Sequence, residues 1–204
     1  MKPFVKICGL TRPEDARLAV RLGATHVGCV MVPTSPRCAS AEQAKSVFRA
    51  AGDGVRRVLV FKRQTPSAIL EVARHVGTTD VQLYETPEED ALLLERKGMT
   101  VYRVQRIDAD TGKLPALTPE PTTERPILLD VGGGGSGRTF RWKILRDNYT
   151  HAVFIDDYIR ADNIAALLTH RPYGIDLSSG VESRPGLKDP ARMTAFFEAL
   201  EKSP

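Results

Sequence analysis

Short runs of apolar, often β-branched residues alternate with longer helical patterns from one end of this chain to the other. The alternation predicts parallel β-α units, because separate all-α and all-β regions would group like elements together. Eight strands are predicted, at residues 4–8, 25–31, 56–61, 80–84, 100–104, 126–130, 152–156 and 173–177. Eight such units predict an α/β fold, the parallel eight-stranded (β/α)8 or TIM barrel.

The predicted helices carry start and stop signals. In "TRPEDARLAVRLG", Thr11 is the predicted N-cap, Pro13 lies in the first turn and Gly23 ends the helix. The segments "SAEQAKSVFRAAG", "TPSAILEVARHVG" and "TPEEDALLLERKG" repeat this pattern. Strand, loop, capped helix and final glycine together take about 25 residues, a length that suits one barrel unit.

The length of the chain fits one barrel. It has 204 residues, and barrels of this type range from about 200 residues upward, so residues 1–204 are expected to form a single domain. Segment 107–126 contains four prolines after Lys113, which exclude a long regular helix there. A linker between two domains is disfavoured because the strand-helix alternation resumes at once.

Composition excludes several classes of protein. The net charge of +4 comes from 29 basic and 25 acidic residues without a basic block, so no nucleic-acid partner is expected. Three cysteines without a CxxC pair indicate neither a disulfide framework nor a zinc site. The apolar start is too short for a signal peptide and no run could span a membrane, so a soluble cytoplasmic protein is expected.

The stretch "ILLDVGGGGSGRTF", residues 127–140, joins a predicted strand to a glycine run. It satisfies the GxGxxG pattern of dinucleotide sites, with Asp156 and Asp157 about 20 residues later. The remaining strands of a dinucleotide-binding sheet cannot be placed, and a flexible linker does not usually run into an aromatic pair such as Phe140 and Trp142. A loop whose backbone N–H groups bind phosphate is the favoured interpretation.

In a barrel, the loops that follow the strands line one mouth, and catalytic residues gather there. Chemistry-bearing side chains are therefore expected at the strand ends. They are Cys8, Arg37, Gln82, Tyr84, Arg103, Asp130, Asp156, Asp157 and Asp176.

These residues stand within motifs that resemble phosphoribosylanthranilate isomerase of tryptophan biosynthesis. The motifs, in chain order, are "KICGLTRPEDA" (6–16), "SPR" (35–37), "VQL" (81–83), "LLD" with "GGSGRTF" (128–140) and "YGIDLSSGVESRPGLKDP" (173–190). The resemblance implies an isomerase that converts a phosphosugar-anthranilate by an Amadori rearrangement, without cofactor or metal.

The resemblance also assigns roles. Cys8 matches the general base and Asp130 the general acid, while packing and a loop cap are their structural alternatives. Arg37 matches the residue that binds the anthranilate carboxylate, and Gln82 and Asp176 are further substrate-binding candidates. The other two cysteines, Cys29 and Cys38, are assigned to packing or surface.

For phosphate, the resemblance implies backbone N–H groups in two loops: Gly135, Ser136 and Gly137, and Ser178, Ser179 and Gly180, the latter entering a short helix. A third loop departs from the family, because "DDYI" (156–159) replaces a glycine pair. An ionised carboxylate ~4 Å from a phosphate oxygen would cost roughly 4 kcal/mol. Tyr84 and Glu85 also replace the usual His-Gly.

Three functions therefore remain open. The leading one is the isomerisation itself. The second is a divergent barrel enzyme that acts on a different substrate, including a non-phosphorylated one, and the third is a non-catalytic anion-binding homologue. The partner is expected to be a small molecule, and the sequence leaves monomer and homodimer open.

Overall fold

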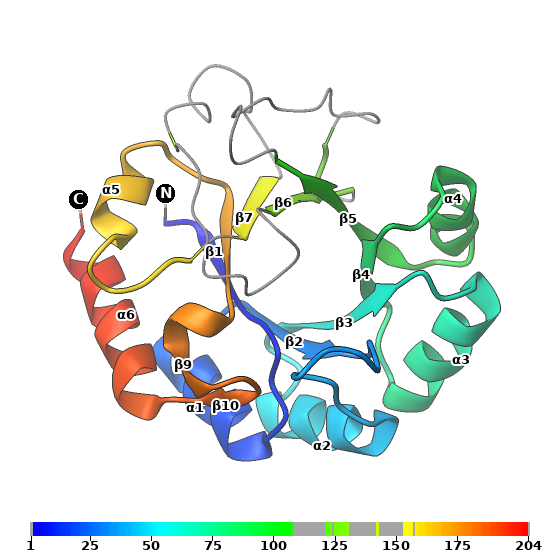
Figure 1. Ribbon diagram of the computed structural model, residues 1–204, viewed down its shortest axis with the longest axis horizontal. Helices are drawn as coiled ribbons and strands as arrows, with labels where there is room; N and C mark the ends of the chain where they lie inside the picture. Colours follow the sequence, from blue (N-terminus) through cyan, green and yellow to red (C-terminus); the bar gives the residue numbers. More distant parts are fainter. Residues whose placement is uncertain are drawn as a thin grey trace.

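Eight parallel strands close into a barrel in the order β1 to β8, with helices outside the ring (Figure 1). The computed structural model describes residues 2–107, 121–123, 125–130, 142, 153–156 and 158–203. The strands are β1 (Phe4–Ile7), β2 (His26–Val30), β3 (Arg56–Lys62), β4 (Asp80–Tyr84), β5 (Thr100–Arg106), β6 (Ile127–Asp130), β7 (Val153–Asp156) and β8 (Gly174–Leu177). The predicted architecture is confirmed.

The helices surround this ring. They are α1 (Pro13–Leu22), α2 (Ala41–Ala51), α3 (Pro66–Val76), α4 (Glu88–Arg96), α5 (Ile164–Leu168) and α6 (Pro190–Lys202). Most of segment 107–126, and the glycine loop with the residues that lead to β7, lie outside the described residues, apart from Trp142. The prediction that 107–126 lacks a long helix therefore stays a prediction.

The predicted helix caps are correct in some helices and wrong in others. Ser40 makes a reciprocal capping box with Gln43, and the Thr65 side chain accepts a hydrogen bond from the N–H of Ala68. Thr11 does not cap α1: the N-cap residue is Arg12, and the Thr11 hydroxyl donates instead to the carbonyl of Gly186. That prediction was wrong because the helix begins one residue later than expected, with Pro13 as its first residue.

Alternate residues of each strand face opposite sides of the barrel wall. The outward set is apolar and packs under the helices, as Ile7, Val27 and Leu59 do in the main core cluster. The inward set differs between the two ends of the barrel. Val58, Tyr102, Leu128 and Phe154 form an apolar cluster near the strand starts, and polar side chains lie near the strand ends.

A small hairpin that the sequence analysis did not predict follows β8. A single 3-10 turn, η2 (Ser179–Val181), leads into the antiparallel strands β9 (Glu182–Arg184) and β10 (Leu187–Lys188). The expected short helix after β8 is therefore only one turn, so its dipole contributes little to anion binding. The hairpin instead places Glu182 and Lys188 beside the barrel mouth.

Candidate active site

A cavity of about 250 Å³ lies at the carboxyl-terminal end of the strands. This is the end at which barrel enzymes hold their catalytic residues. Its lining combines a thiol, a carboxyl, hydroxyls, an amide and cationic side chains. The residues are Cys8, Val30, Val32, Thr34, Ser35, Pro36, Arg37, Val60, Lys62, Gln82, Tyr84, Arg106, Asp156 and Ser178.

Four ionisable side chains share one layer of the barrel interior under this mouth. The register pairs Lys6 with Asp176, Asp176 with Asp156, and Asp156 with Asp130 across four adjacent strands. Residues paired in this way point to the same face of the sheet, and each of the four is at most 8% exposed. Three carboxyl groups and one ammonium group are therefore buried side by side.

Lys6 is the cation of this layer. Its ammonium lies 2.6 Å from Oδ2 of Asp176. It also lies beside the Cys8 thiol, since a Cβ on Gly28 would be 3.3 Å from Nζ of Lys6 and 3.1 Å from Sγ of Cys8. Burial by itself lowers the pKa of a lysine, but here the charges of Asp176 and Cys8 outweigh it and raise the pKa of Lys6 above its ordinary value. Lys6 is therefore a fixed positive charge beside the thiol.

The predicted base, Cys8, follows β1 and is 8% exposed. Burial raises the pKa of its thiol to about 11, and the negative charge of Asp176 acts in the same direction, while Lys6 opposes both. The thiol therefore holds its proton at neutral pH in the unliganded protein. Any role as a base requires a nearby group that accepts this proton.

Asp156 and Tyr84, two of the departures from the family pattern, contact each other. The Tyr84 hydroxyl lies 3.3 Å from Oδ2 of Asp156, across the barrel from β4 to β7. Burial raises the pKa of Asp156 well above its ordinary value, and the charges of Asp176 and Asp130 raise it further. This direction favours the protonated carboxyl, which repels a phosphate less than an ionised carboxylate does. Asp157 lies outside the described residues.

Arg37 lies at the cavity wall, and one edge of its guanidinium group is paired with Glu182. Its Nε and Nη2 donate to the two carboxylate oxygens of Glu182 at 3.0 and 2.7 Å. Lys188 also donates to Glu182, at 2.9 Å. Although burial opposes the shift, the hydrogen bonds from Arg37 and the charge of Lys188 lower the pKa of Glu182. The pair orients the guanidinium and does not use its Nη1 group.

Two glycines make space for these side chains. Gly9 has a φ of +71°, which favours glycine, and a Cβ there would lie 2.7 Å from Cδ of Arg37. A Cβ on Gly180 would collide with the carbonyl oxygen of Ile159. Gly180 is therefore required for the close approach of two loops, whether or not it also binds phosphate.

The other predicted site residues divide into two groups. Gln82 is fully buried, and its Nε2 lies 3.3 Å from the Tyr84 hydroxyl. Among the described residues, Oε1 of Gln82, Oδ1 of Asp176 and Oγ of Ser178 are buried without a hydrogen-bond partner. Such atoms are costly unless a ligand satisfies them. Ser179 and Gly180 form η2 beside them, and Gly135, Ser136 and Gly137 lie outside the described residues.

Arg103 does not belong to the site. Its guanidinium makes ion pairs with Glu88 at 2.8 Å and Glu95 at 2.6 Å, both on α4. The side chain therefore faces the helix layer and not the barrel interior. The other two cysteines are placed as predicted: Cys29 packs in the core and Cys38 is exposed.

The sequence analysis missed Lys6, Glu182 and Gly28. Lys6 stands within an apolar strand, and only the alternation of inward and outward positions could have shown that it faces the interior beside Cys8. Glu182 lies on the unpredicted hairpin. Gly28 faces the thiol, since a Cβ there would lie 3.1 Å from Sγ of Cys8 and 3.3 Å from Nζ of Lys6.

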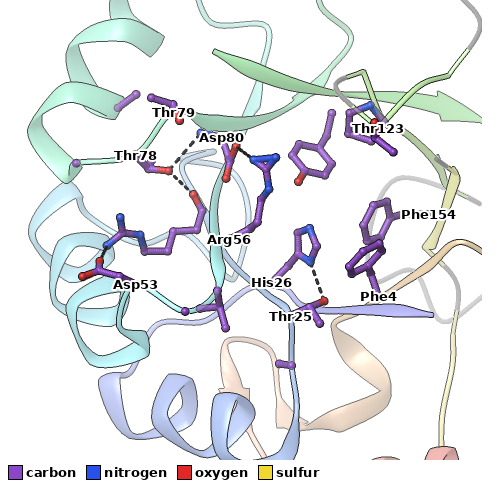
Figure 2. Close-up of a pocket in the computed structure, with 18 of the residues that line it drawn as sticks. Phe4, Thr25, His26, Asp53, Arg56, Thr78, Thr79, Asp80, Thr123 and Phe154 are labelled. Atoms are coloured by element: carbon purple, nitrogen blue, oxygen red, sulfur yellow. Dashed lines mark hydrogen bonds and ion pairs between the residues drawn. The ribbon is translucent and has the colours of Figure 1, made fainter. Parts of the chain in front are cut away.

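A larger cavity, of about 1070 Å³, lies at the opposite end of the barrel. Figure 2 shows the rings of Phe4, His26 and Phe154 gathered there, with Arg56 paired to Asp80 at 2.9 Å. The described residues that line this cavity include no cysteine and neither of the predicted catalytic residues, Cys8 and Asp130. Residue chemistry, and not volume, therefore makes the smaller cavity the candidate active site.

Comparison with known proteins identifies the family of this chain. The family model for N-(5'-phosphoribosyl)anthranilate isomerase matches residues 5–199. This chain belongs to the phosphoribosylanthranilate isomerase family. The N-(5'-phosphoribosyl)anthranilate isomerase of Nitrosococcus oceani is 35% identical to it over 208 residues, which cover 98% of each chain.

Solved structures of phosphoribosylanthranilate isomerases have the same fold. The enzyme from Thermotoga maritima is 34% identical, with a TM-score of 0.86 and 98% of each chain covered. A phosphoribosylanthranilate isomerase in complex with reduced 1-(o-carboxyphenylamino)-1-deoxyribulose 5-phosphate is 32% identical, with a TM-score of 0.85 and 98% of each chain covered. Among the described helices, none is long and apolar enough to cross a membrane.

Proposed function

We propose that this chain isomerises N-(5'-phosphoribosyl)anthranilate to 1-(o-carboxyphenylamino)-1-deoxyribulose 5-phosphate, a step of tryptophan biosynthesis. The observation that carries the proposal is membership of this family over residues 5–199, together with a buried thiol and carboxyl groups at one barrel mouth. The similar structure with a bound reduced product analogue supports the substrate class.

The reaction needs an acid and a base on either side of the sugar. Asp130 protonates the ring oxygen, so the ring opens to an imine whose nitrogen bears the anthranilate. Cys8, as thiolate, then removes the proton from C2, and the resulting enolamine tautomerises to the aminoketone. Each proton transfer of this kind contributes about 10² to 10⁴ in rate.

The cavity also offers groups for the two anionic ends of the substrate. Arg37, oriented by Glu182, binds the anthranilate carboxylate through its remaining Nη1 group, and Lys62 and Arg106 add positive charge at the cavity wall. Gln82 and Asp176 bind the sugar.

Phosphate binding is proposed for two loops. They are Ser178, Ser179 and Gly180 after β8, and Gly135, Ser136 and Gly137 after β6. The buried hydroxyl of Ser178 supports the first loop, because among the described residues it has no partner. We further propose that residues 1–204 act as one domain in the cytoplasm, as a monomer or homodimer and without nucleic-acid or membrane partners.

The test is turnover of the proposed substrate. Purified protein supplied with phosphoribosylanthranilate should remove its anthranilate-type fluorescence, and Cys8→Ser should slow this about 10²-fold or more. Cys38→Ser, an exposed cysteine, is the matched control and should leave the rate unchanged. Absence of turnover at saturating enzyme would refute the proposal.

Two further variants separate the alternative functions. A divergent enzyme predicts weak turnover that rises strongly when glycine replaces both Asp157 and Tyr158, the positions at which the family has its glycine pair. A non-catalytic anion-binding protein predicts that Cys8→Ala with Asp130→Asn keeps full ligand affinity although the parent shows no turnover. The proposed isomerase predicts turnover in the parent without either change.

A further inference from the structure

The proposed reaction requires a thiolate, yet the environment of Cys8 favours the protonated thiol. Burial and the charge of Asp176 raise its pKa to about 11. An enzyme that used this thiol as base at neutral pH would need a local acceptor for the S–H proton and a cation to stabilise the thiolate. Both are present within the charged layer of the barrel.

Charged and titratable groups approach the thiol from several strands and from the hairpin. Of these groups, Lys6 lies beside the thiol, because Nζ of Lys6 and Sγ of Cys8 are both within 3.3 Å of the position that a Cβ on Gly28 would take. All of them interact with the thiol through charge. They are Lys6 on β1, Cys29 on β2, Tyr84 on β4, Asp156 on β7, Asp176 on β8 and Lys188 on β10, with Arg37, Lys62 and Arg106 in the same cavity wall.

Lys6 connects the thiol to one particular carboxylate. Its Nζ donates to Oδ2 of Asp176 at 2.6 Å, and both side chains are almost completely buried, at 0% and 1% exposure. The second carboxylate oxygen, Oδ1, is buried without a hydrogen-bond partner among the described residues. Asp176 therefore has capacity to accept a proton.

We propose that Lys6 is a positioning residue that bridges Cys8 and Asp176, so that Asp176 accepts the proton of the Cys8 thiol. In this step the S–H bond breaks and an O–H bond forms on Asp176. The ammonium group stays charged and shifts its main interaction from the carboxylate to the new thiolate. No other reactant is needed, and the net charge of the three groups does not change.

Gly28 keeps the space in which this bridge forms. A Cβ there would lie 3.1 Å from the Cys8 sulfur, 3.2 Å from Cε of Lys6 and 3.3 Å from its Nζ. These distances are shorter than usual van der Waals contact, so a side chain at this position would push the thiol and the ammonium apart. The bridge thus depends on close packing from β2 as well as on charge.

The test measures thiol chemistry directly. In a Cys38→Ser background, iodoacetamide alkylation of Cys8 is followed from pH 6 to 10 by mass spectrometry of the peptide that contains it, which separates it from buried Cys29. Alkylation reports the thiolate fraction. Lys6→Met should slow it at pH 8 about tenfold or more, and Asp176→Asn should accelerate it by a similar factor, because each pKa unit changes the thiolate fraction about tenfold.

The alkylation rate should change in opposite directions in Lys6→Met and Asp176→Asn, and this distinguishes the bridge from a purely structural role. Asp176→Asn should alkylate faster while it lowers isomerase turnover, since the negative charge is lost together with the proton acceptor. Lys188→Met is the matched control, because this buried lysine is paired to Glu182 instead, and it should change the alkylation profile less than Lys6→Met. An unchanged profile in Lys6→Met, or slower alkylation in Asp176→Asn, would overturn the proposal.

If Lys6→Met fails to fold, because it leaves Asp176 buried without its cation, the double variant Lys6→Met with Asp176→Asn replaces it. The double variant should alkylate more slowly than Asp176→Asn alone, and equal rates would reject the bridge. The role of the thiolate as base rests on the proposed function, but the alkylation test of the bridge is independent of that function. A parent without turnover but with the expected alkylation pattern would refute the isomerase and leave the bridge standing.

Discussion

The two ends of the barrel interior are closed by different chemistry. At the strand starts, the rings of His26, Tyr102 and Phe154 meet edge to face, with centroids 5.1 to 6.0 Å apart. At the strand ends, three aspartates and Lys6 share one layer. The first end gains stability from burial of apolar surface. The second end buries charged and titratable side chains, which costs folding stability but supplies the groups for proton transfer.

The balance of charge shows the same difference. At the strand starts, Arg56 and Asp80 form a one-to-one pair, and burial, helped by the charges of Lys6 and Arg56, lowers the pKa of His26 to about 3, so its ring is neutral. At the strand ends, three carboxyl groups lie in one layer with the ammonium group of Lys6. Perturbed groups of this kind are common in active sites. Substitutions at the two ends should therefore affect different properties.

The largest expected effect is on activity at the strand ends. Asp130→Asn should lower kcat about 10² to 10⁴-fold, because the amide cannot protonate the ring oxygen, with no loss of thermal stability. Steady-state kinetics and thermal unfolding measure the two properties. Asp53→Asn, at an exposed surface position, is the control and should change neither. A variant with normal kcat would remove Asp130 from the mechanism.

Next in size is an effect on stability at the strand starts. Phe154→Ala should lower the free energy of unfolding by about 3 to 5 kcal/mol, because a buried ring leaves a cavity. Denaturant unfolding measures this. Phe4→Ala removes a ring of the same cluster that is 39% exposed, and it should cost below about 1 kcal/mol. Equal costs for both variants would mean that the aromatic cluster is not a stabilising core.

A smaller effect of opposite sign is expected from Asp156→Asn. The raised pKa of Asp156 means that this carboxyl resists ionisation in the folded protein. Its contribution to the stability of the fold therefore falls as the pH rises above about 4, the ordinary pKa of an aspartate. A neutral amide avoids this loss, and thermal unfolding should shift upward by a few degrees at pH 8 and less at pH 4. A downward shift at pH 8 would show that the Tyr84 contact outweighs the cost of burial.

The last effect concerns His26 and is absent at neutral pH. Its pKa of about 3 lies below the ordinary 6.5, so the unfolded chain binds more protons between these values. His26 therefore costs no stability above pH 6.5 and lowers stability as pH falls toward 3, by at most about 1.4 kcal/mol per pH unit. His26→Gln should flatten the dependence of unfolding free energy on pH between 6.5 and 4. An unchanged slope would assign acid sensitivity to other groups.

Sequence patterns predicted local features well where one segment contains the whole signal. Ser40 and Thr65 cap their helices because donor and acceptor lie three residues apart. The same reasoning failed for Thr11, whose hydroxyl bonds to Gly186. It failed for Arg103 for another reason: the residue lies in the middle of β5, and its side chain faces α4.

By itself, the sequence determined the eight barrel strands and their order, the barrel class and the family, because these depend on local periodicity and on motifs that are continuous along the chain. Only the tertiary structure decided which polar side chains meet: Lys6 with Asp176, Tyr84 with Asp156, and Arg37 with Glu182. These partners lie 170, 72 and 145 residues apart. Their contacts depend on the register in which the barrel closes. Their protonation depends on burial in the closed barrel, which no single segment of the sequence specifies.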